Sequence, residues 1–192
     1  MTRTRGYMNK KLNFCYRAIS VLLGNGEESH TLVRHQLIQK LKTHKDSCTR
    51  LYEHEVKFEV IYEALVPWLG AYTPMLNWMR FPEMRHLIAC AYDRMCIDLM
   101  RYGFSKTFFP LRTAPPINPN DGIMCIGWLA KLSHFVQVYL KPGCPIPPTS
   151  PEWLFHHATD AETEPDLFVD RMHKFKRLNN IEKESNKEKP KL

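Results

Sequence analysis

Residues 15–23 read CYRAISVLL, a mostly apolar run that ends at the glycine-bearing stretch GNG at 24–26. Its length and apolar content indicate a helix that packs in a core. Glycine accepts the left-handed backbone conformation in which many helices end, so the helix is predicted to stop at residues 24–26. This helix and the residues just before it decide how the rest of the chain is interpreted.

Three further helices are predicted before residue 93. Ser29 is placed to cap the first, in which apolar residues recur every fourth position from Val33 and Arg34 lies on the outer face. The second spans about 55–66, where apolar residues again return at helical spacing. Pro82 begins the third, because proline is tolerated in the first turn of a helix.

The sequence pattern changes after residue 93. Short apolar or alternating runs lie between segments rich in glycine, proline and asparagine, at 95–101, 106–111, 122–129 and 134–140. Such runs are typical of strands, and alternation in the last run indicates a strand with two different faces. Helices followed by strands predict an α/β (α+β) domain in which helices pack on a small central sheet.

The two ends of the chain differ in composition from the middle. Residues 1–10 form a basic N-terminal segment without an acidic side chain. Within a C-terminal extension at 159–178, residues 165–178 can form one amphipathic helix. The last stretch, 179–192, has no apolar periodicity and is predicted to be a disordered tail.

Composition limits the possible classes of protein. The chain has 192 residues, of which 44% are hydrophobic and 24% charged, which suits one globular domain with a full core. No apolar run approaches the roughly 20 residues that cross a membrane, so no membrane partner is expected. Six cysteines lie far apart with no secretory signal before them, which favours reduced, mostly buried thiols and a cytoplasmic or nuclear location. No cofactor and no metal are predicted, since the His156-His157 pair lacks further ligands at metal spacing.

The charge of the chain favours an anionic partner without identifying one. The formal net charge is +7 at pH 7. The basic residues are spread out, however, and no basic stripe alternates with aromatic residues. A solvated basic surface is therefore favoured over a specific nucleic-acid site.

Several stretches of the sequence resemble one known family. CYRAIS at 15–20, followed by a second helix with HTLVR at 30–34, is similar to the opening of OTU (ovarian tumour domain) cysteine proteases, which remove ubiquitin. KTFFPL (106–111), IMCIGWL (123–129) and HFVQVYLKPGCPIPP (134–148) resemble an OTU-like plant group associated with Mutator-type transposons. The resemblance covers about residues 11–158. It implies an OTU-like, papain-type cysteine protease fold, with ubiquitin or a ubiquitin-like protein as the partner.

The catalytic opening of that family is only partly matched. Aligning YRA at 16–18 with the family's aromatic-Arg-Ala puts Phe14 at the position of the nucleophilic cysteine and Cys15 one residue late. Leu12 and Lys11 fall on the Gly and Asp of the loop that supplies oxyanion-hole amides in the family. One residue turns a helical side chain by about 100°, so Cys15 is expected to point away from a general base.

The family's base matches better than its nucleophile. His134 corresponds to the histidine that opens the last core strand, and the resemblance implies the role of general base. The family's third catalytic member, two residues later, is replaced by Val136, which cannot orient an imidazole, and Ser133 offers only a weak substitute. Without a thiol at position 14, the base has nothing to activate. The sequence therefore predicts a catalytically inactive relative of the deubiquitinases.

Two alternatives remain from the sequence. In the first, a loop shifted by one residue presents Cys15 to His134, and the chain is an active thiol-dependent deubiquitinase. In the second, the chain is a transposon-derived factor that associates with nucleic acid, in agreement with its net charge of +7.

Overall fold

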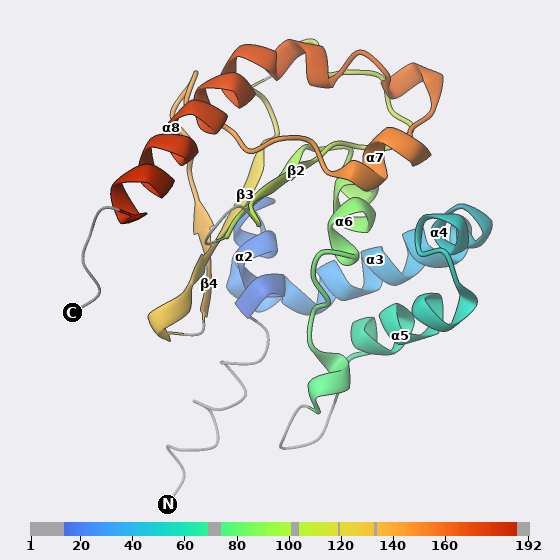
Figure 1. The fold of residues 1–192 in the computed structure, drawn as a ribbon. Coiled ribbons are helices and arrows are strands. Elements are labelled where there is room, and N and C mark those ends of the chain that lie inside the picture. Colours follow the sequence, from blue (N-terminus) through green and yellow to red (C-terminus); the bar gives the residue numbers. More distant parts are fainter. Residues whose placement is uncertain (1–13, 69–73, 101–103, 119, 133, 188–192) are drawn as a thin grey trace, which may run out of the picture.

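The structure is a computed structural model that describes residues 14–68, 74–100, 104–118, 120–132 and 134–187 (Figure 1). Several residues named above lie outside this part of the chain: the basic segment 1–10, Lys11, Leu12, Ser133 and residues 188–192.

The N-terminal helices follow the predicted pattern. Helix α2 (Phe14–Leu22) is confirmed, and the chain leaves it through Gly24 and Gly26, whose φ angles of 80° and 73° suit glycine. A 3-10 turn, η1 (Glu27–Ser29), leads into α3 (His30–Thr43). The predicted cap is wrong in its chemistry: the Ser29 hydroxyl donates to the Asn25 carbonyl, 2.9 Å away, instead of accepting from an amide of α3.

Arg34 is not on the outer face of α3, as the sequence predicted, but is buried with 2% of its surface exposed. Its guanidinium donates to the carbonyls of Ala64, at 2.7 Å, and Asn77, at 3.1 Å, and lies 3.8 Å from the ring centroid of Tyr16. Carbonyls at the end of a helix have no partner within that helix, so a buried cation can satisfy them. Helical periodicity alone does not reveal this requirement.

The remaining helices of this half are partly as predicted. A short helix, α4 (Lys45–Leu51), was not predicted, whereas α5 (Glu55–Leu65) is confirmed. After the 3-10 turn η2 (Met75–Asn77), α6 (Met84–Tyr92) begins later than predicted. Pro82 lies in the preceding turn, where its carbonyl accepts the backbone N–H of Arg85 at 3.0 Å.

Four strands form one mixed sheet in the order β2-β1-β3-β4. They are β1 (Cys96–Leu99), β2 (Lys106–Phe108), β3 (Met124–Leu129) and β4 (His134–Val138). β1 runs antiparallel to β2 and parallel to β3, and β4 runs antiparallel to β3. Each strand lies within a predicted run, so the α/β (α+β) class is confirmed.

The core lies between the sheet and the N-terminal helices. Helices α2 and α6 contact strands, and α3 packs against both of these helices (Figure 1). Fully buried side chains join the layers: Tyr16 and Ile19 from α2, Leu37 from α3, Ile88 from α6 and Ile97 from β1. This packing fixes the start of α2 beside β4.

The chain after β4 returns across the molecule to the far edge of the sheet. Thr149 forms a parallel bridge with Thr107 of β2, where the Thr107 N–H donates to the Pro148 carbonyl at 2.9 Å. Helix α7 (Pro151–His156), which was not predicted, follows at once. Its first turn is capped by Ser150, whose hydroxyl accepts the backbone N–H of Trp153.

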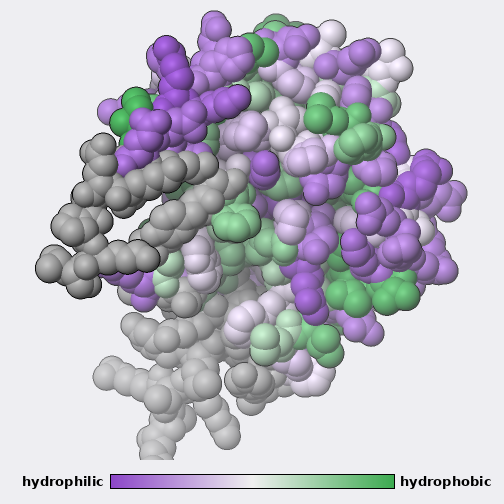
Figure 2. Space-filling model, in the orientation of Figure 1, coloured by the Kyte–Doolittle hydropathy of each residue, from purple (hydrophilic) through white to green (hydrophobic). Residues whose placement is uncertain are grey.

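The C-terminal extension is more helical than predicted. Two 3-10 turns, η4 (Thr159–Ala161) and η5 (Pro165–Phe168), precede α8 (Val169–Lys187). The prediction of a helix that ends near 178 and a disordered tail from 179 is therefore wrong up to residue 187. Residues 179–187 have no apolar stripe with which to pack on a core, but their side chains still have the intrinsic propensity to form a helix. Accordingly, Leu178 and Ile181 are exposed, and Figure 2 shows mostly hydrophilic side chains over α8, at the upper left of that face.

Candidate functional site

Two predicted site positions, Phe14 and His134, lie in direct contact. Phe14 is the first residue of α2, and His134 is the first residue of β4. Their ring centroids are 3.6 Å apart, with an angle of 77° between the ring planes. A side chain at position 14 is therefore within reach of the imidazole, and the side chain present there is a benzyl group with no proton to give up.

Cys15, the next residue, has different surroundings. Its side chain is buried, with 5% of its surface exposed. The sulfur lies 3.7 Å and 3.8 Å from the two terminal nitrogens of Arg85 on α6. Since neighbouring residues of a helix point about 100° apart, Cys15 faces the core while Phe14 faces β4. The structure thus brings His134 together with Phe14 and directs Cys15 to a cation in the core.

The protonation of Cys15 does not suit a nucleophile. Burial raises the pKa of its thiol to about 11, and the nearby charge of Arg85 lowers it only in part. At neutral pH the group is therefore a neutral thiol, whereas the reactive form in thiol chemistry is the thiolate. Burial also withholds the sulfur from a large substrate.

His134 is a half-buried imidazole without an orienting partner. Burial lowers its pKa, and the charge of Glu27 acts in the opposite direction. No side chain in the described part of the chain hydrogen-bonds to the His134 ring. Val136 pairs with Gly127 across the sheet, and its methyl groups cannot accept a hydrogen bond from a ring N–H.

A buried ion pair, missed by the sequence analysis, underlies this region. The Arg85 guanidinium binds the Asp98 carboxylate of β1, and both side chains are almost fully buried. Burial disfavours the charged form of Arg85, but the adjacent Asp98 holds the pKa of the guanidinium above its ordinary value. The signal in the sequence was a charged residue inside each of two apolar runs, at 84–92 and at 95–101.

An aromatic row connects the ion pair with the surface of the sheet. The Arg85 guanidinium lies 3.8 Å from the ring centroid of Phe81. Phe81 lies 4.5 Å from Phe135, and Phe135 lies 4.6 Å from Trp128, measured between ring centroids. Phe135 follows His134 in β4, and because consecutive residues of a strand point to opposite faces, the row lies on the face of the sheet opposite to the His134 side chain.

A second polar network, also missed, ties α6 to α7. The His86 Nε2 atom lies 2.7 Å from the Ser150 hydroxyl oxygen, and that hydroxyl lies 2.9 Å from the Glu152 carboxylate. Burial lowers the pKa of His86 to about 4, so its ring is neutral at neutral pH. Although serine, histidine and a carboxylate suggest a hydrolase triad, the Ser150 side chain is fully buried, so this network is structural.

The other candidate residues have local partners. His157 stacks on the ring of Trp153, with centroids 4.1 Å apart, and its Nδ1 atom lies 2.9 Å from the Trp153 carbonyl oxygen. Over the described ranges, no group of three or more His, Cys, Asp or Glu side chains is placed to hold a metal ion. None of the described helices has the length and apolar content of a membrane-spanning segment. Of the six cysteines, those at 15, 48, 96 and 125 are buried.

The site thus consists of the His134 imidazole in contact with the Phe14 ring, while the thiol of Cys15 is turned into the core. No protein-family model matches this chain, and no curated protein matches its sequence.

Proposed function

We propose that this chain is a catalytically inactive OTU-like domain, spanning about residues 11–158, that binds ubiquitin or a ubiquitin-like protein without cleaving it. The observation that carries the proposal is the contact between Phe14 and His134, whose ring centroids are 3.6 Å apart. The start of a helix against the first residue of a strand is the arrangement that the resemblance implies for nucleophile and base. Here the helix position holds a ring in place of a thiol.

The chemistry of peptide-bond hydrolysis by a thiol needs three groups. A thiolate must attack the carbonyl carbon, a base must take the thiol proton, and a third group must orient that base. Phe14 cannot supply the first, and Val136 cannot supply the third. His134 alone has a chemically suitable side chain, so the site retains the shape for a partner and lacks the means to cut it.

The first experiment is covalent labelling with ubiquitin that carries a C-terminal vinyl electrophile, followed by mass spectrometry of the intact protein. We expect no adduct with the natural chain, because the Cys15 thiol is buried and its pKa is raised to about 11. The Phe14→Cys variant places a thiol next to the imidazole, and we expect it to form an adduct that survives the added Cys15→Ala change. An adduct of the natural chain that disappears on Cys15→Ala would establish the active alternative and refute the proposal.

The second experiment tests binding. Isotope-labelled ubiquitin is titrated with the unlabelled chain, and we expect the resonances of its C-terminal residues to shift. The Phe14→Glu variant should weaken the effect, because it places a charge beside His134 in the contact surface. Val56→Glu is the matched control, since Val56 is an exposed apolar residue, with 74% of its surface accessible, on α5. Equal loss in both variants, or no shifts with the natural chain, would contradict binding at this site.

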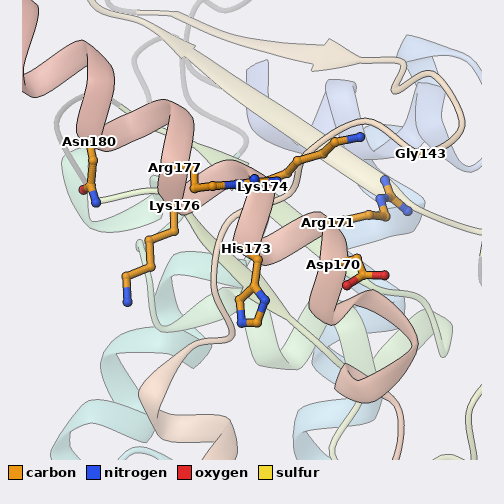
Figure 3. Close-up of a pocket in the computed structure, with 8 residues that line it drawn as sticks. All are labelled: Gly143, Asp170, Arg171, His173, Lys174, Lys176, Arg177 and Asn180. Carbon is orange, nitrogen blue, oxygen red and sulfur yellow. The ribbon is translucent and has the colours of Figure 1, made fainter.

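A second candidate function is association with nucleic acid, and one observation favours it. A hollow of about 840 Å³ on α8 is lined mainly by basic side chains, which extend from successive turns of the helix towards the solvent and the loop after β4 (Figure 3). The lining residues are Gly143, Asp170, Arg171, His173, Lys174, Lys176, Arg177 and Asn180. Clustered lysine and arginine side chains can neutralise backbone phosphates.

The test of this candidate is the salt dependence of binding to a DNA duplex. We expect the affinity to fall steeply with salt, and the slope of log affinity against log salt to shrink by about 0.9 per phosphate contact removed. The variant exchanges Lys174, Lys176 and Arg177 for Gln, and the control exchanges three exposed lysines that do not line the hollow, Lys42, Lys57 and Lys131. Binding that is absent, or equally reduced in both variants, would exclude a specific role of α8.

A further inference from the structure

A second concave region, here called the sheet groove, lies between the sheet, the turn before α6 and the start of α7. Its volume is about 710 Å³. This is within the range of sites that hold small molecules. Its lining does not include Phe14 or His134, so an inference about the groove is independent of the function proposed above.

The walls of the sheet groove are mostly apolar and aromatic. Phe81 and Trp128, both of the aromatic row, line it together with Phe108 of β2 and Phe104. Phe104 has 75% of its surface exposed, at the rim of the groove. Covering such a ring removes apolar surface from water, and aromatic rings gain further from contact with another apolar or aromatic group. The groove is therefore suited to an occupant with a large apolar body.

The register of the sheet brings a charged group into this apolar surface. Lys106 of β2 lies directly opposite Asp98 of β1, so the two side chains share one face of the sheet. Asp98 is already neutralised by the buried Arg85. Lys106 forms no ion pair within the described part of the chain, so its ammonium group is available to an anion in the groove.

Glu152 supplies the opposite charge. Burial raises the pKa of its carboxyl, but hydrogen bonds from its own backbone N–H and from Ser150, with the charge of Lys106, hold that pKa below its ordinary value. The carboxylate is therefore ionised at neutral pH. It accepts one hydrogen bond from Ser150, at 2.9 Å, and a carboxylate has about four acceptor positions. Lys106 and Glu152 line the same groove without forming an ion pair with each other.

We propose that the sheet groove binds a free amino acid with a large apolar side chain, such as phenylalanine or leucine, as a zwitterion. Its carboxylate binds Lys106, and its ammonium group binds Glu152. Its side chain packs between Phe81, Phe104 and Trp128. An apolar monocarboxylic acid would leave Glu152 without a cation, and the interior of a peptide carries neither terminal charge.

The test is isothermal titration of the full-length chain with L-phenylalanine and with two derivatives that each lack one charge. N-acetyl-L-phenylalanine has no ammonium group, and L-phenylalanine amide has no carboxylate. We expect each derivative to bind roughly tenfold more weakly or worse, the effect of losing one charge-assisted hydrogen bond. Glycine has both charges and no apolar body, and we expect no detectable binding of it.

Three variants connect the binding to the groove. Lys106→Met should weaken L-phenylalanine roughly tenfold and leave the amide derivative unchanged, because that derivative has no carboxylate to lose. Glu152→Gln should show the reverse pattern, with the acetyl derivative unchanged. Phe104→Ser should weaken all compounds, and its exposed position makes it safe for the fold. Lys141→Met, at an exposed lysine after β4, is the control that should change nothing.

Three outcomes would overturn the proposal. The first is the absence of binding for both L-phenylalanine and L-leucine to natural protein that is folded by circular dichroism. The second is equal affinity for L-phenylalanine and its two derivatives, which would mean that the charges are not used. The third is binding that Lys106→Met and Lys141→Met affect to the same extent, which would place the ligand elsewhere.

Discussion

The two sides of the first turn of α2 differ although they belong to consecutive residues. On one side, Phe14 is half-exposed and touches the His134 ring at the end of the sheet. On the other side, Cys15 is buried against Arg85, whose charge is balanced by Asp98. On the Phe14 side, a different side chain can be accommodated at the surface. On the Cys15 side, the buried charges of Arg85 and Asp98 neutralise each other, so neither can be removed alone without leaving the other unpaired.

This difference shows that one step along a helix decides which groups a cysteine side chain can reach. Moving one residue along the helix exchanges an imidazole neighbour for a buried cation. A change of side chain at position 14 is expected to be compatible with the fold, because the buried contacts lie on the side of Cys15. Four measurements can break or sharpen this comparison, beginning with the largest expected effect.

Removing the Asp98 carboxylate should have the largest effect. We expect Asp98→Ala to lower the free energy of unfolding by about 3–5 kcal/mol, because it leaves Arg85 as a buried charge without a partner. Urea denaturation followed by circular dichroism measures this loss. Asp160→Ala, at an exposed carboxylate, should change stability by about 0.5 kcal/mol or less. A loss below about 1 kcal/mol for Asp98→Ala would show that the pair is not essential.

Acid should destabilise the buried side through His86, the neighbour of Arg85 on α6. Burial lowers the pKa of folded His86 to about 4. The unfolded value is about 6.5, so between these values the unfolded state binds more protons. The contribution of neutral His86 to the free energy of unfolding should therefore be fully present above about pH 6.5. It should fall by about 3 kcal/mol as the pH is lowered to about 4. The measurement is the free energy of unfolding from urea denaturation at several pH values in this range. The His86→Gln variant should show a weaker dependence of this free energy on pH. An unchanged dependence would mean that other groups cause it.

The reactivity of Cys15 should reflect its burial. With a pKa of about 11, its thiolate fraction at pH 8 should be about 100-fold lower than that of an ordinary thiol. Alkylation by iodoacetamide, followed by peptide mass spectrometry, should therefore label Cys15 at least that much more slowly in native protein than in urea. The same residue in the unfolded chain is its own control. Equal rates in both states would mean that Cys15 is presented to solvent.

The smallest effect is expected on the open side of the helix. Phe14→Ala removes a half-exposed ring and one edge-to-face contact, so we expect a loss of about 1 kcal/mol in the free energy of unfolding. Ile19→Ala, in the same helix but fully buried, should cost about 2–5 kcal/mol by the same urea denaturation. If the two variants lost equal stability, the two sides of α2 would not differ as described.

Much of the fold could be predicted because it depends on local patterns. The apolar runs at 95–101, 106–111, 122–129 and 134–140 contain the four strands, and the glycines at 24–26 end α2. The short helices α4 and α7 were not predicted, because fewer than two full turns give no reliable periodicity of apolar residues. The full length of α8 was not predicted either, because its C-terminal part is polar and has no apolar stripe that would indicate a helix.

The candidate site could be predicted only where the place of a residue in one helix or strand determines the direction of its side chain. The contact of Phe14 with His134 was implied by the resemblance, and the inward direction of Cys15 followed from helix geometry. The pairing of Arg85 with Asp98 joins two segments whose proximity no local pattern shows. Burial of charged side chains is decided by such tertiary partners, so it becomes visible only when the chain is folded.

The return of the chain to β2 also bears on aggregation. The segment that bridges Thr107 through Thr149 contains prolines at 145, 147 and 148, which have no N–H to offer to a further strand. A strand from another molecule therefore finds few donors beyond β2, an arrangement by which natural proteins protect a sheet edge. Pairing between molecules, during folding or at high concentration, would then be directed to the β4 edge of the sheet.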